Sequence, residues 1–338
     1  MNALRRRDVL AALVAVPLGG YGSRPAAWQG AAPVPFSTQE IYPAVHRGRL
    51  YVAGGIAARL GVPYFTDRCV SYEVSRDSWR DEPRLPESLH HVALLSTGDA
   101  LYAMGGFNGG YSHVWRMRSA VYQLTEGNWR EVAAFPKPLA EGVATLAPSG
   151  RIHYVTGQSP QGEANAKRND HAEVYDHLCF DPGDGRWRPL APIPTARNSA
   201  CGGWLGGQLV VAGGRTATGN LAVTEIYDPA RDSWHQGRPM PLPQAGTAGA
   251  VVNHRLYVFG GEIFQPSASV FAEAWRYVLE KDEWQAMPPL PTPRHGLGAG
   301  VIGNNIHVVG GATRPGGRGT SDIHEVLDVA GLRRSDVV

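Results

Sequence analysis

The sequence predicts an all-β fold built from six repeats of about fifty residues. A pair of glycines ends five short runs of β-branched and aromatic residues, and Gly157-Gln158 stands where a sixth pair would fall. Five tryptophans each follow an aromatic residue by seven positions, with turn-forming residues between the two. Because Val and Tyr favour strands and glycine ends them, each repeat is expected to hold four short antiparallel strands.

The paired glycines are Gly54-Gly55, Gly105-Gly106, Gly213-Gly214, Gly260-Gly261 and Gly310-Gly311. The spaced aromatic and tryptophan pairs are Tyr72 and Trp79, Tyr122 and Trp129, Phe180 and Trp187, Tyr227 and Trp234, and Tyr277 and Trp284. A proline-rich run, such as residues 287–294, follows and fits an edge strand that leads to the next repeat. We interpret these regular residues as structural: glycines serve a backbone with positive φ, and aromatic rings pack between repeats.

The sixth repeat lacks its own tryptophan. Leu327 takes the aromatic position, and the sequence ends before a tryptophan could follow. Trp28 lies near the other end of the sequence and is followed by Pro33-Val34-Pro35-Phe36. We expect residues 33–36 to form the outer strand of the last repeat, which would hold both ends of the chain together and leave no sheet edge open.

The diglycine, the spaced aromatic, the tryptophan and the Leu-Pro run recur in register, and in this the sequence resembles the kelch-repeat family over nearly all of residues 28–338. The resemblance implies one domain, a six-bladed β-propeller with four antiparallel strands per blade. The last blade would be closed by the N-terminal strand.

Residues 1–27 resemble a twin-arginine export signal. Arg5, Arg6 and Arg7 precede an apolar stretch at residues 9–18, which is about half of the ~20 residues that span a bilayer. We therefore expect a cleaved signal, a periplasmic or secreted bacterial protein, and no membrane span in the mature chain. The alternative is a basic tail on a cytosolic protein.

Charge and cysteine content exclude several classes of protein. The formal net charge of +2 becomes −1 when the charged residues of 1–27 are left out, so no basic surface for nucleic acid is expected. The three cysteines, Cys69, Cys179 and Cys201, form no Cys-x-x-Cys pair, which argues against a disulfide framework and a structural zinc site.

The residues ten to twelve positions after each tryptophan should meet at one mouth of the ring, where a propeller usually has its ligand funnel. The six triplets are Thr38-Gln39-Glu40, Leu89-His90-His91, Leu139-Ala140-Glu141, Arg197-Asn198-Ser199, Gln244-Ala245-Gly246 and Arg294-His295-Gly296. Structural repetition explains what these copies share, but it does not explain their differences. The differences therefore predict a ligand site.

The candidate acid–base residues are Glu141, Glu40 and Glu262. The candidate ligand-binding residues are Arg197, Asn198, Arg294, His295, His90, His91, Arg215 and Asp170, the last from a long loop at residues 158–176. An alternative for Arg197 and Arg294 is a structural role in the repeated Pro-x-x-Arg pattern. A metal held by His90 or His91 with Glu40, Glu141 or His295 is disfavoured, because the sequence has no helical His-x-x-x-His or dense carboxylate motif. His90 and His91 are not expected to bind together, because neighbouring residues of an extended strand point apart. We expect neither metal nor other cofactor.

The predicted function is binding of a polar ligand, a carbohydrate or sugar acid, with possible mutarotase-type or epimerase-type acid–base activity. The chain resembles the sialic-acid mutarotases, also called N-acetylneuraminate epimerases, in size and blade number. Their catalytic glutamate follows a glycine pair, as Glu262 does here, but the family's arginine six positions later is Ala268 in this sequence. The alternative is a non-catalytic protein-interaction scaffold of the cell envelope, which would need an exposed apolar patch.

Overall fold

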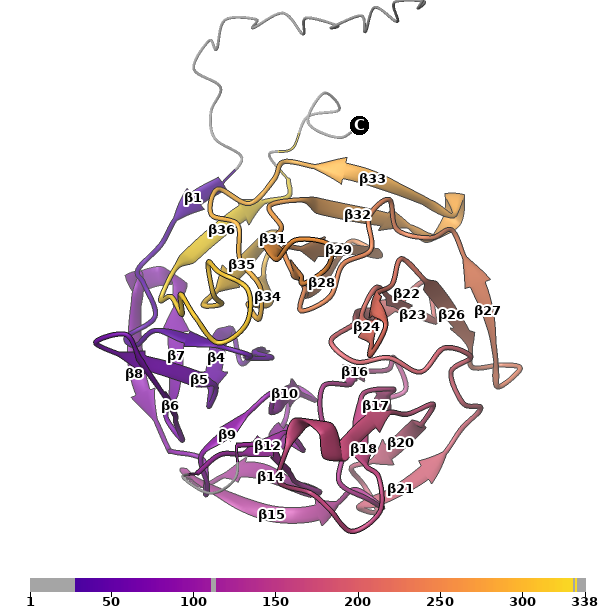
Figure 1. Cartoon of the computed structure of the whole chain (residues 1–338), viewed down its shortest axis with the longest axis horizontal. Helices are drawn as coiled ribbons and strands as arrows, with labels where there is room; N and C mark the ends of the chain where they lie inside the picture. The colour runs from indigo at the N-terminus through magenta and orange to yellow at the C-terminus, as the bar shows by residue number, and fades with distance from the viewer. Residues whose placement is uncertain (1–27, 111–113, 331, 333–338) are drawn as a thin grey trace, which may run out of the picture.

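The computed structural model describes residues 28–110, 114–330 and 332. The predicted export signal, residues 1–27, lies outside these residues. The described chain forms six four-stranded antiparallel sheets, which stand as blades in a ring around a central axis (Figure 1). Within the same residues, no helix is long and apolar enough to cross a membrane.

Each blade has four strands, which follow one another from the propeller axis to the outer edge. Blade I has β3 (Ala44–His46), β4 (Arg49–Ala53), β7 (Cys69–Glu73) and β8 (Ser78–Glu82); blade II has β10 (Ala93–Ser96), β11 (Leu101–Met104), β14 (Ala120–Thr125) and β15 (Asn128–Ala134); blade III has β16 (Val143–Leu146), β17 (Ile152–Val155), β20 (His177–Asp181) and β21 (Arg186–Pro189). Blade IV has β22 (Cys201–Leu205), β23 (Gln208–Ala212), β26 (Thr224–Asp228) and β27 (Ser233–Gly237); blade V has β28 (Ala248–Val252), β29 (Arg255–Phe259), β32 (Ala274–Val278) and β33 (Glu283–Met287); blade VI has β34 (Gly298–Ile302), β35 (Asn305–Val309), β36 (His324–Asp328) and β1 (Trp28–Gly30).

Short strands lie in the loops on one face of the ring. They are β2 (Thr38–Gln39), β5 (Ile56–Arg59), β6 (Val62–Phe65), β9 (Leu89–His90), β12 (Phe107–Asn108), β13 (Arg116–Met117), β18 (Gln158–Pro160), β19 (His171–Glu173), β24 (Arg215–Thr216), β25 (Gly219–Asn220), β30 (Glu262–Ile263) and β31 (Ser269–Val270). The helices of the described chain are three single turns, η1 (Val74–Arg76), η2 (Arg168–Asp170) and η3 (Leu279–Lys281). The three cysteines are buried as free thiols.

The two ends of the described chain meet in blade VI. Strand β1 pairs with β36, and Trp28 lies opposite Leu327, just as Trp79 lies opposite Tyr72 in blade I (Figure 1). The closure is as predicted, but its position is a correction: the pairing strand is Trp28–Gly30, not residues 33–36. Two prolines in residues 33–36 lack the N–H that a ladder requires.

The hydrophobic core is divided into wedges between neighbouring blades. One cluster joins blades I and II through Tyr51, Leu89 and Leu101, and another joins blades V and VI through Phe259 and Ile306. Tryptophan indoles tie one blade to the next, because Trp79 donates to the Ala32 carbonyl at 2.8 Å and Trp129 donates to that of Pro83 at 2.8 Å. The regular tryptophans are therefore structural.

The glycine pairs are required by the backbone. At Gly54, φ is +68°, and an added Cβ would lie 2.2 Å from the Leu89 carbonyl oxygen. The sixth pair lies one residue earlier than predicted. The two residues that precede β18 are Thr156 and Gly157, whereas the sequence predicted Gly157-Gln158. Thr156 adopts φ of 58° and uses its hydroxyl to bond the Val174 and Arg197 carbonyls.

Candidate functional site

The last residue of every triplet lies on a ring around the propeller axis. Five of the six ring residues donate a backbone N–H to the carbonyl oxygen of a neighbour in the ring, at 2.7 to 3.0 Å. The bonds run from Glu40 to Gly296, from Gly296 to Gly246, from Gly246 to Ser199, from Ser199 to Glu141 and from His91 to Glu40. Between His91 and Glu141 the side chains approach instead, with Nε2 and Oε1 3.2 Å apart. The triplets therefore converge at one place, as the sequence predicted.

All six ring residues have a left-handed backbone. Their φ angles lie between 54° and 67°, a range that suits Gly246 and Gly296. Glu40, His91, Glu141 and Ser199 occupy the same conformation, which costs a residue with a Cβ about 1–2 kcal/mol. Strained backbone that the surrounding structure maintains is a mark of functional sites.

Carboxylates alternate with histidine or arginine side chains around the ring. Glu141 and Glu40 flank His91, whose Nε2 lies 2.9 Å from Glu40 Oε2. The circuit continues through His295, Glu262 and Arg215, with His295 Nδ1 3.6 Å from Glu40 Oε1 and 3.5 Å from Glu262 Oε2, and Arg215 donating to Glu262 at 2.7 Å.

Asn198 and Ser199 complete the circuit. Arg215 Nε donates to Asn198 Oδ1 at 3.3 Å, and Ser199 Oγ donates to Glu141 Oε2 at 3.1 Å. Most of these side chains are buried, but 13% of the Glu40 side chain and 9% of the Arg215 side chain are exposed. These two are the ring groups that a ligand in the funnel would meet first.

Hydrogen-bond geometry determines the protonation of the two histidines. His90 lies 2.7 Å from the Val114 carbonyl, which only accepts, so its Nε2 carries the proton. Burial, together with the neighbouring His91, lowers the pKa of His90 to about 3, so His90 is neutral and its Nδ1 accepts. His91 Nδ1, 2.7 Å away, must then donate, while its Nε2 faces two carboxylates. The hydrogen bond with His90 thus places a proton on Nδ1 of His91.

The carboxylate of Glu40 is the ionised partner of His91. Burial opposes its ionisation, but His91, His295 and Arg215 together lower its pKa below the ordinary range.

Contact between His90 and His91 corrects the expectation that they would point apart: His91 has φ of 55°, so the segment is not extended there.

Arg197 and Arg294 do not reach the funnel, which corrects their prediction as ligand-binding residues. Both are fully buried inside their blades. Arg197 pairs with Glu225 and donates to the Val211 carbonyl, and Arg294 makes the equivalent bonds to Glu325 and to the Val308 carbonyl. Their charges are satisfied by the strands, so the alternative structural role is the correct one.

Asp170 shapes the long loop through one of its two carboxylate oxygens, Oδ2, and stays a candidate ligand-binding residue. Its carboxylate accepts from the backbone N–H groups of Ala166 and Lys167, both at 2.8 Å, and these bonds lower its pKa. The loop reaches blade II, where the Asn165 side chain bonds both backbone groups of Met117.

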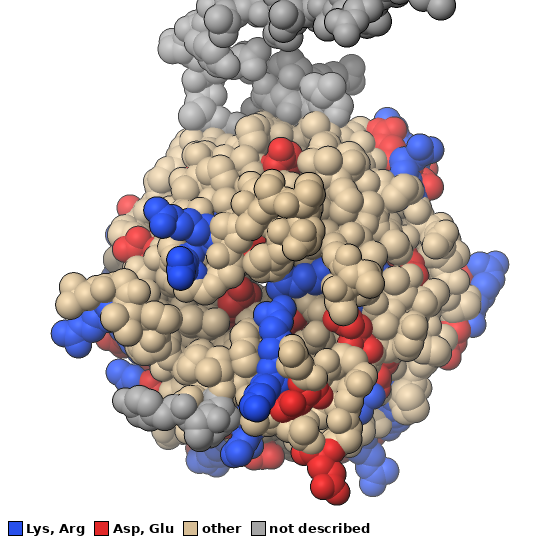
Figure 2. All heavy atoms as spheres, in the orientation of Figure 1, with Lys and Arg blue, Asp and Glu red and all other residues tan. Residues whose placement is uncertain are grey.

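The mouth above the ring carries aromatic rings and cations. Arg168 lies 5.1 Å above the ring of Trp115, and Arg215 lies 5.7 Å from that of Phe264. Figure 2 shows basic and acidic atoms gathered around a hollow at the centre of this face. Within the described residues, no group of three or more His, Cys, Asp or Glu side chains is placed to hold a metal ion.

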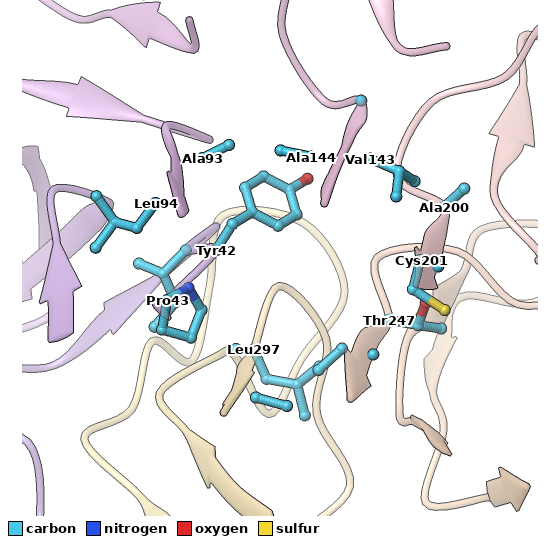
Figure 3. A pocket seen from close by; sticks show the side chains of 17 residues that line it. Tyr42, Pro43, Ala93, Leu94, Val143, Ala144, Ala200, Cys201, Thr247 and Leu297 are labelled. Atoms are coloured by element: carbon cyan, nitrogen blue, oxygen red, sulfur yellow. The ribbon is translucent and has the colours of Figure 1, made fainter. Parts of the chain in front are cut away.

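A cavity of about 100 Å³ lies next to the ring and is lined by the inner strands of the blades. The side chain of Tyr42 extends into it among small residues such as Ala93, Ala200 and Cys201 (Figure 3). Burial, with Glu141 and Glu40, raises the pKa of Tyr42 well above its ordinary value, so its hydroxyl stays protonated. Sequence reasoning missed Tyr42. The size of its side chain was a signal that could have indicated it, because the residues two positions after the other triplets are all smaller.

Comparison with known proteins identifies the repeats. The Kelch motif family model matches residues 196–241 and 245–291. Kelch repeat and BTB domain-containing protein 12 of Danio rerio is 31% identical over 186 residues, which cover 50% of this chain and 29% of that protein. Kelch-like protein terF of Aspergillus terreus is 24% identical over 235 residues, which cover 68% of this chain and 51% of that protein. The chain spans about half or less of these relatives' lengths. The chain therefore contains kelch motifs and folds as a kelch-type β-propeller.

Proposed function

We propose that the funnel binds a small ligand rich in hydroxyl groups, a carbohydrate or sugar acid. The observation that carries this proposal is the ring itself: four of its six positions place polar side chains on backbone that glycine would adopt at lower cost. A purely structural ring would have no use for that strain.

The chemistry of the ring suits such a ligand. Carboxylates accept hydrogen bonds from hydroxyl groups, while histidine and arginine donate to hydroxyl or ring oxygens. Trp115 and Phe264 at the mouth present flat apolar faces, and Arg168 adds an exposed positive charge for an acidic sugar. Few convergent polar groups with aromatic walls are typical of a ligand pocket.

The pair of Glu40 and His91 supports mutarotase-type activity. In mutarotation a base removes the proton of the anomeric hydroxyl, and an acid protonates the ring oxygen as the ring opens. An ionised Glu40 can accept the first proton, and His91, whose Nε2 lies 2.9 Å from Glu40 Oε2, can supply the second from that nitrogen when it carries a proton. Reclosure reverses both transfers and regenerates the two groups.

Thermal unfolding of residues 28–338 with neutral sugars, sialic acid and uronic acids tests the binding. A sugar at 100 times its dissociation constant adds about 2.7 kcal/mol, a shift of several degrees. Glu40→Gln should lose the shift, and the exposed Glu280→Gln should keep it. No shift with any sugar would refute the proposal. For a sugar that binds, NMR of anomer exchange then tests turnover.

Binding of a protein partner, the alternative function, is a second candidate. It requires an exposed apolar patch, and the β5–β6 hairpin carries one. Leu60, Val62 and Tyr64 are 98%, 66% and 40% exposed. Replacing Leu60 and Val62 with serine should therefore reduce partner binding without lowering the melting temperature.

A further inference from the structure

We infer that a cavity between blades III and IV binds a small aromatic acid that carries a hydroxyl group. This inference goes beyond the proposed function, because the site is separate from the funnel. The cavity has a volume of about 400 Å³, which lies in the range of small-molecule sites. Its lining includes residues of the β16–β17, β22–β23 and β26–β27 turns. Because neighbouring strands of a blade run antiparallel, these turns lie at the end of the blades away from the funnel.

His153 lines this cavity and has one nitrogen with a lone pair and no partner. His177 Nδ1 lies 3.3 Å from the Ala191 carbonyl, which only accepts, so this nitrogen carries the proton. Burial lowers the pKa of His177 to about 3 and that of His153 to about 4, so both rings are neutral. His177 Nε2 therefore accepts, and His153 Nδ1, 2.8 Å away, donates to it. This leaves His153 Nε2 unprotonated, without a hydrogen-bond partner in the described chain.

Trp204, another residue of the lining, supplies a complementary donor. Its ring stands edge-on to that of His153, with the two centroids 5.0 Å apart. Its indole N–H is buried and has no acceptor among the described residues, although buried donors in folded proteins are nearly always bonded. A hydroxyl group suits this pair of residues, because it donates one hydrogen bond and accepts another.

The rest of the lining determines the shape and charge of the ligand. Pro148 and Leu190 add apolar surface beside the ring of Tyr227, which favours a flat aromatic group. Arg151 is exposed, and its Nε donates to Asp181 at 3.2 Å. The other N–H groups of this guanidinium remain available for a carboxylate.

The spacing of these groups indicates the size of the ligand. Arg151 stands two residues before His153, so along an extended chain the two residues are about 7 Å apart and point to the same side. A single benzene ring with a hydroxyl group at one end and a carboxylate at the other fits this spacing. An aliphatic hydroxy acid lacks the flat face, and a neutral phenol leaves Arg151 unused.

Arg151 and Trp204 depart from the repeat. The junction of blades VI and I contains an equivalent histidine pair, but the residues that match Arg151 and Trp204 there are Asn305 and Val45. Packing of a histidine pair between two blades thus requires neither an arginine nor an indole. The two departures are explained by a ligand that contacts both.

The test is isothermal titration calorimetry of the protein with 4-hydroxybenzoate. Two analogues of this probe each lack one contact: 4-methoxybenzoate cannot donate to His153, and methyl 4-hydroxybenzoate has no charge for Arg151. Each should bind about tenfold more weakly than 4-hydroxybenzoate. In NMR, the indole N–H signal of Trp204, identified by its absence in Trp204→Phe, should shift when 4-hydroxybenzoate binds.

Matched variants locate the site. Arg151→Gln should weaken binding of 4-hydroxybenzoate about tenfold and leave that of the methyl ester unchanged, and His153→Phe should weaken binding of both. Arg255→Gln and His307→Phe change the equivalent positions of blades V and VI and should leave binding as it is in the wild-type protein. Glu40→Gln, in the funnel, should also have no effect.

The contrary outcomes are distinct from a failure of the proposed function. Absence of binding at millimolar 4-hydroxybenzoate would overturn the site. Equal affinity for 4-methoxybenzoate would overturn the hydroxyl contact with His153. Binding that is lost in Glu40→Gln but kept in Arg151→Gln would place the aromatic acid in the funnel and overturn the inference.

Discussion

At the scale of single residues, the ring at the propeller axis shows how a backbone position determines chemistry. A left-handed residue turns its side chain away from the direction that an extended strand would give it, which is why His91 meets both His90 and Glu40. Gly296 has the matching role, because a Cβ there would lie 2.8 Å from the Glu40 carboxyl carbon. A glycine in one blade thus makes room for a carboxylate from the next.

The hydrogen bonds predict which ring nitrogens of the two histidines carry a proton: Nε2 of His90 and Nδ1 of His91. In nitrogen NMR of isotope-labelled protein, these two nitrogens should give the shifts of protonated nitrogens, and Nδ1 of His90 should give the shift of an unprotonated nitrogen. A protonated Nδ1 of His90 or an unprotonated Nδ1 of His91 in the wild-type protein would contradict the assignment.

Arg197 is expected to contribute to stability and not to ligand binding. Arg197→Met would leave Glu225 buried without its partner and should lower the free energy of unfolding by about 3–5 kcal/mol. Adding Glu225→Met should recover much of that loss, because both charges are then absent. Urea denaturation measures both variants. A double variant no more stable than Arg197→Met alone would show that the pair is not an isolated charge couple.

At the scale of the element, strand identity was predictable where two markers agreed. The Tyr72 and Trp79 spacing predicts the β7–β8 pair, and Tyr72 does lie opposite Trp79. At the start of the described chain two signals lie close together, Trp28 and an apolar run interrupted by prolines, and the apolar run pointed to residues 33–36 instead of Trp28–Gly30. The tryptophan position was the better marker, because Trp28 faces Leu327 as Trp79 faces Tyr72.

The turn between β28 and β29 offers a test of element stability. Asn253 and His254 are exposed and adopt φ of 50° and 58°, which is the turn type that favours Asn-Gly. His254→Gly should raise the free energy of unfolding by about 1 kcal/mol, because glycine adopts this conformation without a Cβ clash. His254→Ala is the control and should give no gain. Equal effects of both variants in urea denaturation would exclude the backbone explanation.

At the scale of the whole molecule, stability depends on contacts between blades. Two junctions contain the same buried device, a pair of histidines: His153 Nδ1 lies 2.8 Å from His177 Nε2, and His307 Nδ1 lies 2.9 Å from His324 Nε2. In each pair the second histidine packs edge-on against the tyrosine of the next blade, Tyr227 or Tyr72.

These histidine pairs predict acid sensitivity. Burial lowers the pKa values of His153 and His307 to about 4 and that of His177 to about 3, whereas an unfolded histidine has a pKa near 6.5. The unfolded chain therefore binds more protons between these values. Stability should be complete above about pH 6.5 and should fall, by up to about 1.4 kcal/mol per pH unit for each group, down to about pH 4.

Urea denaturation across this range measures the effect. Replacing His307 and His324 together with glutamine should reduce the pH dependence but not abolish it, since His153, His177 and His90 still titrate in the variant. An unchanged slope would mean that other groups titrate in this range.

The repeat pattern predicted the architecture because each blade repeats one set of packing requirements. It could not predict the histidine pairs or Tyr42, because these depend on which residues face one another across two blades. The triplets were predicted to converge, and Glu40, His91 and Glu141 do so. The roles of Arg197 and Arg294 depended on Glu225 and Glu325, about thirty residues further along the chain, and no local pattern indicated these pairings.

The pairing of β1 with β36 has a consequence for synthesis. The ribosome makes Trp28–Gly30 almost three hundred residues before their partner strand exists. Until then, β1 can only wait unpaired or form a wrong pairing, and contacts of such long sequence separation form slowly. We therefore expect the nascent chain to remain open at blade VI until β36 has emerged from the ribosome, and the arrival of β36 to be the event that allows the ring to close.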